Sequence, residues 1–244
     1  MTHELTGIVI AKNEQKDLPG CLESMEAFCD TTVVIDNESA DRTAEIAAKY
    51  GAKVINAVMY YDSGFAGLRN VGLQAVETSH AVFFDADERP DATLVDAILA
   101  AKQRGAQDTA YKMMRRNNAF GGWLDHGRFG GDGQVRLFPS DTRYSGVVHE
   151  VPDLPENTET IMLDGTLEHF TYASLGEYIK KMRDYSIKSV QKGDPVPSIS
   201  ESAAKLRQNL IDKQAYKDGW RGIAMIGGDA WADHLMRQAN RIHS

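Results

Sequence analysis

The chain has 244 residues, 42% of them apolar, and a formal net charge of −8. A chain of this length and composition can bury one substantial core, which excludes disorder as its general state. The acidic balance excludes a general affinity for nucleic acid, because phosphate binding needs clustered lysine and arginine. Residues 173–244 nevertheless hold 12 Lys+Arg against 8 Asp+Glu. Solvated helix faces explain this basic tail, and contact with an anionic acceptor or a membrane surface stays open as the alternative.

The sequence shows no membrane-spanning or export segment. No apolar stretch approaches the roughly 20 residues that cross a bilayer, and the first four residues lack the basic and apolar parts of a signal peptide. We therefore expect a cytoplasmic protein, with a position at the inner face of the membrane left open. Cys21 and Cys29 fall on the apolar face of a predicted helix, where we expect reduced, buried thiols.

Short β-rich segments alternate with helical periodicity over the first 104 residues. The apolar pattern predicts strands at 5–11, 31–35, 52–55 and 81–84, and helices at 18–29, 41–50, 67–76 and 90–104. This alternation is typical of an α/β fold with a parallel sheet covered by helices. Ligands of such a sheet bind beyond the carboxyl ends of its strands.

The segment 109–170 is rich in glycine and aromatic residues, and its short alternating stretches predict antiparallel strands and functional loops. Helical periodicity returns after Ser174. That serine and Glu177 match a helix capping box, and Ser198 with Glu201 gives a second one. The sequence thus predicts an α/β domain at 1–172 and a helical extension at 173–244 packed on it.

The predicted strand at 81–84 ends directly in Asp85, Ala86 and Asp87. Two carboxylates that follow a buried strand at the ligand-binding edge of a sheet can share one cleft, and such oxygen ligands suit Mg²⁺ or Mn²⁺. A cation there would stabilise a departing diphosphate as a Lewis acid. A surface pair or a helix cap is the structural alternative, and the position at the sheet edge favours the metal site.

Four segments resemble the inverting GT-A glycosyltransferases of family 2. They are IVIAKNE at 8–14, VIDNESADRT at 34–43, GLRN at 67–70 and FDADE at 84–88. The resemblance runs from about residue 5 to about residue 190. It implies a GT-A fold, which is a Rossmann-like, mostly parallel sheet with helices on both faces, here with C-terminal helices added. It also implies sugar transfer from a UDP-sugar to an acceptor hydroxyl with Mn²⁺ or Mg²⁺.

The later half resembles the branch of this family that contains lipopolysaccharide core β-glucosyltransferases. RLF at 136–138, VHE at 148–150 and LEHF at 167–170 carry this resemblance, together with Lys180 and Tyr185. It implies glucose as the sugar, and a lipopolysaccharide core, another surface glycan or a glycolipid as the acceptor.

The resemblance also implies roles for individual residues. The nucleotide would contact Ala11, Asn13, Glu14, Asp36, Arg69 and Asp85. Asp87 would bind the metal directly, and His169 would complete the metal site. Glu150 would be the catalytic base, with Asp132 as the alternative, because an inverting displacement needs a carboxylate close to the acceptor hydroxyl.

Acceptor contacts are expected from the glycine-flanked segment that holds Trp123, His126 and Arg128, a composition suited to stacking and hydrogen bonding with a sugar. His149 is a further candidate, for the acceptor, for orienting Glu150 or for replacing His169 at the metal. A turn with a buried tryptophan, and a histidine with a structural role, are the alternatives.

Three other functions stay open at this stage. A nucleotidyltransferase acting on sugar nucleotides also uses an acidic metal site, although the first loop lacks a glycine-rich phosphate cradle. A phosphatase with Asp85 as nucleophile is another enzyme class. A non-catalytic glycan-binding GT-A module is the binding-protein alternative. The sequence leaves the oligomeric state undetermined.

Overall fold

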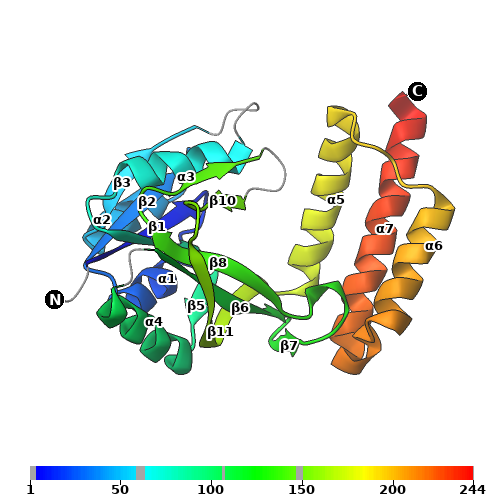
Figure 1. Ribbon diagram of the computed structural model, residues 1–244. Coiled ribbons are helices and arrows are strands. Elements are labelled where there is room, and N and C mark those ends of the chain that lie inside the picture. Colours follow the sequence, from blue (N-terminus) through cyan, green and yellow to red (C-terminus); the bar gives the residue numbers. More distant parts are fainter. Residues whose placement is uncertain (1–3, 59–63, 106–107, 147–150, 244) are drawn as a thin grey trace. The chain divides into compact units, whose positions relative to one another are not determined.

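The computed structural model describes residues 4–58, 64–105, 108–146 and 151–243 (Figure 1). The chain forms two compact units, one made of Met1–Arg115 and Gly133–Glu168 and the other of Arg116–Asp132 and His169–Ser244. These units group the segment 116–132 with the C-terminal helices, whereas the predicted domain division lies at residue 172. The domain division itself stays a prediction.

Four parallel strands form the first part of the sheet, in the order β3-β2-β1-β4. They are β1 (Leu5–Ala11), β2 (Thr31–Asp36), β3 (Lys53–Asn56) and β4 (His80–Asp85). In the register of these strands Ala11 pairs with Asp36, and Ile10 pairs with Asp85. The carboxyl ends of β1, β2 and β4 therefore lie at one edge of the sheet. All four strands match the predicted ones to within one residue at every end.

Helices cover both faces of these strands. They are α1 (Leu18–Met25), α2 (Thr43–Lys49), α3 (Gly64–Gln74) and α4 (Ala92–Arg104). Successive strand residues point to opposite faces, so Val9 and Phe84 pack in the core under α1, α2 and α4, while Ile8 and Phe83 pack in the core under α3. Figure 1 shows α3 across the sheet from α1 and α4. Each such buried side chain contributes about 1.5–3 kcal/mol.

The remaining strands extend the sheet in the order β4-β8-β6-β11-β5, with β7 paired to β6. Their bounds are β5 (Glu88–Pro90), β6 (Thr109–Ala119), β7 (Gly122–Leu124), β8 (Asp132–Pro139) and β11 (Glu159–Tyr172). β8 runs antiparallel to β4. β9 (Arg143–Ser145) and β10 (Val151–Asp153) form a separate antiparallel pair. Asp132, which the sequence placed in a loop, is the first residue of β8.

The second unit contains three helices that Figure 1 shows side by side, α5 (Leu175–Lys192), α6 (Ile199–Arg207) and α7 (Gly219–His243). A π-helical turn (Gln208–Asp212) follows α6. The buried ring of Tyr178 lies at the centre of an apolar cluster with Met225 and Leu124. Within the part of the chain that is described, no helix is long and apolar enough to cross a membrane. The predicted α/β fold with C-terminal helices is confirmed.

The two predicted capping boxes have different outcomes. At α6 the Ser198 hydroxyl accepts from the Glu201 amide while the Glu201 carboxylate accepts from the Ser198 amide, so this box is complete. At α5 the Ser174 hydroxyl accepts from the Glu177 amide as predicted, but the Glu177 carboxylate accepts from the amide of Ala173. The second half of that prediction was therefore wrong by one residue.

Candidate functional site

The loop after β1 is fastened to the loop after β2 by hydrogen bonds. The Asn13 amide donates to Ser39 Oγ at 2.9 Å, and Asn13 Oδ1 accepts from the Ala40 amide at 2.7 Å. The Glu14 amide donates to Thr43 Oγ1 at 2.8 Å. Polar residues of the 34–43 motif therefore set the position of the loop in which Asn13 and Glu14 lie.

Asp41 completes this fastening. Its Oδ1 accepts from the Thr43 amide at 3.0 Å and from the Thr43 hydroxyl, and its Oδ2 accepts from the Gln15 amide at 3.2 Å. Desolvation acts to raise the pKa of Asp41, but these hydrogen bonds outweigh it and lower the pKa below the usual value. Asp41 thus stays ionised while it binds Thr43, the first residue of α2, and Gln15 of the first loop.

Asn13 has a positive φ of 59°, which predicts different effects for two substitutions. Asn13→Ala is expected to lower the free energy of unfolding by about 2 kcal/mol, because alanine is strained in this conformation and cannot accept from Ala40. Asn13→Gly relieves the backbone strain and is expected to lower it by about 1 kcal/mol. Urea denaturation measures both. Equal losses would contradict the backbone role assigned to this position.

Asp36 is the last residue of β2, and it is only 5% exposed. Its Oδ2 accepts from the Ser39 amide at 3.3 Å. Its Oδ1 is buried and receives no hydrogen bond from the residues that the structure describes. A buried acceptor without a donor costs about 1–3 kcal/mol, so a ligand that offers an N–H or O–H here would recover that free energy. The small side chain of Ala11 lies beside it on β1.

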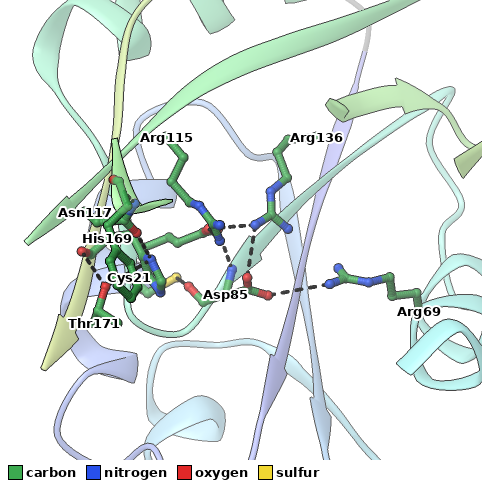
Figure 2. A network of polar contacts seen from close by, with 10 residues as sticks. Cys21, Arg69, Asp85, Arg115, Asn117, Arg136, His169 and Thr171 are labelled. Carbon is green, nitrogen blue, oxygen red and sulfur yellow. Dashed lines mark hydrogen bonds and ion pairs between the residues drawn. The ribbon is translucent and has the colours of Figure 1, made fainter. Parts of the chain in front are cut away.

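Asp85 ends β4 between two arginines (Figure 2). Arg136 Nη2 donates to Asp85 Oδ2 at 3.0 Å, and Arg69 Nη2 lies 3.8 Å from Asp85 Oδ1. The Arg69 guanidinium also lies over the rings of Phe83 and Tyr144, at 5.5 and 5.2 Å from their centroids. Both carboxylate oxygens of Asp85 therefore face a cation, and Arg69 is held at the sheet edge.

A buried carboxylate, that of Glu88, contacts both Asp85 and Arg136. The Glu88 side chain is fully buried, and its Oε1 accepts from Arg136 Nη2 at 2.6 Å and lies 3.7 Å from Arg115 Nη1. Glu88 Oε2 accepts from the Asp85 amide at 2.9 Å. Burial acts to lower the pKa of Arg136, but the charges of Glu88 and Asp85 outweigh it and raise that pKa above its usual value. The arginine is permanently charged.

Sequence reasoning missed this cluster. Arg136 and Glu88 belong to the quoted segments at 136–138 and 84–88, but neither was assigned a role, and Arg115 was not considered. A glutamate that follows Asp85 and Asp87 in the same turn was a signal, because three adjacent acids at a sheet edge need basic neighbours. The sequence did not say which arginine supplies them.

Asp87 lies in the turn between β4 and β5, and its side chain is half-buried. Arginines lie beside both oxygens of Asp85, and direct contact of Asp87 with a cation stays a prediction. Among the described residues no group of three or more His, Cys, Asp and Glu side chains is placed to hold a metal. A Mg²⁺ or Mn²⁺ ion at Asp87 would therefore take further ligands from water and substrate phosphates, as Mg²⁺ commonly does.

His169 belongs to the second unit. Its Nδ1 lies 2.7 Å from Asn117 Oδ1, which can only accept, so Nδ1 carries the proton. The Asn117 amide group donates to the Phe129 carbonyl at 2.8 Å, which fixes that orientation. In a neutral ring this tautomer would place the lone pair on Nε2, a nitrogen that can bind a metal. That His169 completes a site with Asp87 stays a prediction.

The expected acceptor residues that are described all lie in the second unit. Arg116 lies over the half-buried Trp123 ring at 4.9 Å. His126 Nδ1 lies 2.7 Å from Asp218 Oδ1. Arg128 pairs with Asp229 at 2.7 Å. Their contacts to a sugar stay predictions.

Of the two candidates for the catalytic base, the structure describes only Asp132. Glu150 and its neighbour His149 lie outside the described residues. Asp132 is half-buried at the start of β8. The choice between Glu150 and Asp132 therefore stays as the sequence left it.

The cysteines do not supply a nucleophile at the sheet edge. Burial raises the pKa of both Cys21 and Cys29, so both remain thiols. Cys21 Sγ contacts the Asp85 carbonyl at 3.5 Å, and both cysteines are free. The expectation of a buried thiol on a helix is confirmed for Cys21, whereas Cys29 is half-buried and follows α1, which ends at Met25 and not at residue 29 as predicted.

Comparison with known proteins points to one family. The profile described as "Glycosyl transferase family 2" matches residues 6–166. An uncharacterized glycosyltransferase of Rickettsia bellii is 28% identical over 124 residues, which cover 48% of this chain and 41% of that protein. The 4,4'-diaponeurosporenoate glycosyltransferase of Staphylococcus haemolyticus is 36% identical over 93 residues, which cover 35% and 24%. The chain thus matches less than half the length of these relatives.

Solved structures show a more distant likeness. Glucosyl-3-phosphoglycerate synthase from Mycobacterium tuberculosis, in complex with Mn²⁺ and UDP-glucose, aligns over 79% of this chain and 80% of that chain, with a TM-score of 0.45 and 14% identity. S. aureus TarS aligns over 88% of this chain and 44% of that chain, with a TM-score of 0.45 and 16% identity.

Proposed function

Because the chain belongs to glycosyl transferase family 2, we propose that it moves a sugar from a UDP-sugar, UDP-glucose above all, to an acceptor hydroxyl with inversion. The observation that carries the proposal is the buried Asp36 oxygen without a donor, at the same sheet edge as the Asp85–Asp87 turn. A uracil N–H or a ribose hydroxyl would supply the missing hydrogen bond. The acidic turn beside it suits the metal-bound diphosphate of the same molecule.

The donor would be held by residues on three neighbouring strands and the loops that follow them. Asn13 and Glu14 lie in a loop that Ser39 and Thr43 fasten, which would define one wall of the nucleotide pocket. Arg69 has a buried Nε without a partner among the described residues and would meet the base or the diphosphate. Asp85, already bound to arginines, would contact the ribose or the metal through water.

A divalent cation fits the oxygen donor of Asp87, and the ion would stabilise negative charge on the departing diphosphate. Mn²⁺ and Mg²⁺ both suit such a site. His169 would be a further ligand through Nε2. The role of the protein is to fix these donors before the substrate arrives, and the Arg136–Glu88 pair does this for the turn that carries Asp87.

The acceptor would be a surface glycan or glycolipid, such as a lipopolysaccharide core, met by Trp123, His126, Arg128 and His149. Glu150 would take the proton of the attacking hydroxyl, with Asp132 as the second candidate. A cytoplasmic enzyme working at the inner face of the membrane would meet such an acceptor.

Nucleotide specificity tests the donor assignment. Isothermal titration calorimetry with Mn²⁺ is expected to show that UDP binds at least about tenfold more tightly than GDP, which corresponds to about 1.4 kcal/mol. Asp36→Ala is expected to remove most of this preference if Asp36 accepts from the uracil N–H, because the base then loses its acceptor; a contact to the ribose would instead weaken UDP and GDP alike. A chelator should weaken UDP binding to the wild-type chain. Equal affinity for UDP and GDP would overturn the assignment.

Substitution of the proposed base separates chemistry from binding. Glu150→Gln is expected to reduce transfer by about 100-fold or more, because glutamine cannot take the acceptor proton, while UDP affinity changes less than about twofold. Asp132→Asn is the matched comparison and is expected to leave transfer largely intact. If Asp132→Asn loses most of its transfer activity while Glu150→Gln stays active, Asp132 and not Glu150 is the base.

A further inference from the structure

The second unit contains a cavity of its own, of about 480 Å³, between α5, α6, α7 and the turn that follows α6. This volume is in the range of small-molecule binding sites. Every residue that lines it belongs to the second unit. Nothing proposed above uses this cavity, apart from the expected contact of Arg128 with the acceptor.

The walls of the cavity combine aromatic and aliphatic side chains. Tyr172 is 8% exposed, whereas Tyr185 is 63% exposed. Both line the cavity, together with Ile226 and Met236, which are nearly buried. An aromatic ring that stays this exposed offers a flat apolar surface with a polar hydroxyl, the kind of surface found where one face of a ligand is apolar.

Two carboxylates of α7 supply hydrogen-bond acceptors in the same cavity. Arg128 Nη2 donates to Asp229 Oδ1 at 2.7 Å, and the Tyr178 hydroxyl, which donates to the Met225 carbonyl at 2.7 Å, lies 3.3 Å from the same oxygen. The Ser202 hydroxyl donates to Asp233 Oδ2 at 2.8 Å, and Lys205 Nζ lies 3.8 Å from that oxygen. The other oxygen of each carboxylate, Asp229 Oδ2 and Asp233 Oδ1, receives no hydrogen bond from any described residue. Each can still accept from a ligand.

A third acceptor lies in the π-helical turn. Asn209, which lines the cavity and is 9% exposed, donates through Nδ2 to the Lys205 carbonyl at 2.9 Å. Its Oδ1 has no donor among the described residues. Single π-helical turns occur frequently at functional sites. The cavity is therefore rich in acceptors and poor in uncommitted donors.

The positively charged side chains that line the cavity already interact with neighbouring residues. Arg128 pairs with Asp229, Lys205 lies beside Asp233, and Lys181 Nζ lies over the Tyr172 ring at 5.1 Å. A phosphate would meet two carboxylates here, and a hydrocarbon chain would leave the acceptors without donors. A ligand with several hydroxyl groups and an apolar ring face satisfies both conditions.

From this arrangement we propose that the cavity of the helical unit is a saccharide-binding site, with Tyr185 stacking on the sugar and Asp229 and Asp233 accepting from its hydroxyls. The proposal rests on the proposed function only for the role of the bound sugar, which would be part of the acceptor glycan. Binding energy from a part of the acceptor remote from the reaction can be used to orient the reacting hydroxyl.

Saturation-transfer NMR on the full chain tests the proposal, with UDP and Mn²⁺ present to occupy the donor site. The probes are methyl β-glucoside, N-acetylglucosamine, methyl α-mannoside and lactose. At least one is expected to bind, and Tyr185→Ala and Asp233→Asn are each expected to weaken it by about tenfold. Tyr216→Ala removes a tyrosine that is 50% exposed in the same unit and does not line the cavity, so it is expected to change nothing.

Three outcomes would overturn the saccharide site. They are no binding by any of the four sugars, binding that both cavity variants leave intact, and displacement of the sugar by hexyl phosphate, which would identify the ligand as an amphipathic anion. Thermal melts check that the variants fold. The same samples report UDP binding, so a chain that binds a sugar in the cavity but not UDP would contradict the proposed function and leave this site standing.

Discussion

Arg136→Met is expected to lower the free energy of unfolding by about 3 kcal/mol, at the lower end of the range for breaking a buried ion pair. The substitution leaves the fully buried Glu88 without its 2.6 Å partner, and Arg115 lies farther from the same oxygen, at 3.7 Å. Methionine fills much of the space, so the loss is mainly electrostatic. Urea denaturation measures it.

The double variant Glu88→Gln/Arg136→Met is the control. Glutamine keeps an acceptor for the Asp85 amide but carries no charge, so the double variant is expected to be more stable than Arg136→Met alone. UDP affinity should stay reduced in both variants, because Asp85 has lost the guanidinium at 3.0 Å that orients it. Wild-type stability of Arg136→Met would contradict a buried charge at Glu88.

Asp87→Asn is expected to reduce Mn²⁺-dependent hydrolysis of UDP-glucose by about 100-fold or more, because the metal loses its charged ligand and several kcal/mol of leaving-group stabilisation with it. Folding should be unaffected, since the side chain is half-buried in a turn. Release of UDP, measured with saturating Mn²⁺ and without acceptor, gives the rate.

The matched control is Asp96→Asn, the same chemical change at an exposed position on α4 of the same unit. Its rate is expected to equal that of the wild type. If Asp87→Asn keeps wild-type hydrolysis and wild-type dependence on Mn²⁺, the metal does not bind at this turn.

The parallel half of the fold was predictable because helices cover both faces of its strands. Strands buried on both faces are nearly continuous apolar segments, and polar residues mark where they end. Asp36 and Asp85 follow such segments, and the pairing of β2 and β4 with β1 brings their ends to one edge. The expectation that Asp85 and Asp87 lie at a ligand-binding edge therefore came from the hydrophobic pattern, whereas the role of Asp36 came from the family resemblance.

The partners of these residues were not predictable, because they depend on contacts between distant segments. Arg136 and Glu88 are 48 residues apart, and nothing local distinguishes a buried arginine from an exposed one. Ser39 and Asp41 matched a family motif. That they accept hydrogen bonds from the loop after β1, and so hold it in place, is visible only in the structure.

The sequence also did not predict that the segment 116–132 belongs with the C-terminal helices. This segment has many glycines and no clear periodicity, so no pattern indicated its neighbours. In the structure the rings of Phe120 and Trp220 stack at 5.6 Å, and His126 pairs with Asp218. The cavity beside Tyr185 likewise takes its residues from separate helices, whose packing the sequence does not specify.

The proposed function requires that the carboxyl edge of the parallel sheet binds a nucleoside diphosphate sugar and that the nucleoside diphosphate is released. Phosphorus-31 NMR of the products tests it most directly, after incubation of the chain with UDP-glucose and Mn²⁺. UDP should accumulate in the wild type, and neither a chelated sample nor Asp87→Asn should produce it. Pyrophosphate or inorganic phosphate as the product, or UDP formed equally by Asp87→Asn, would contradict the claim.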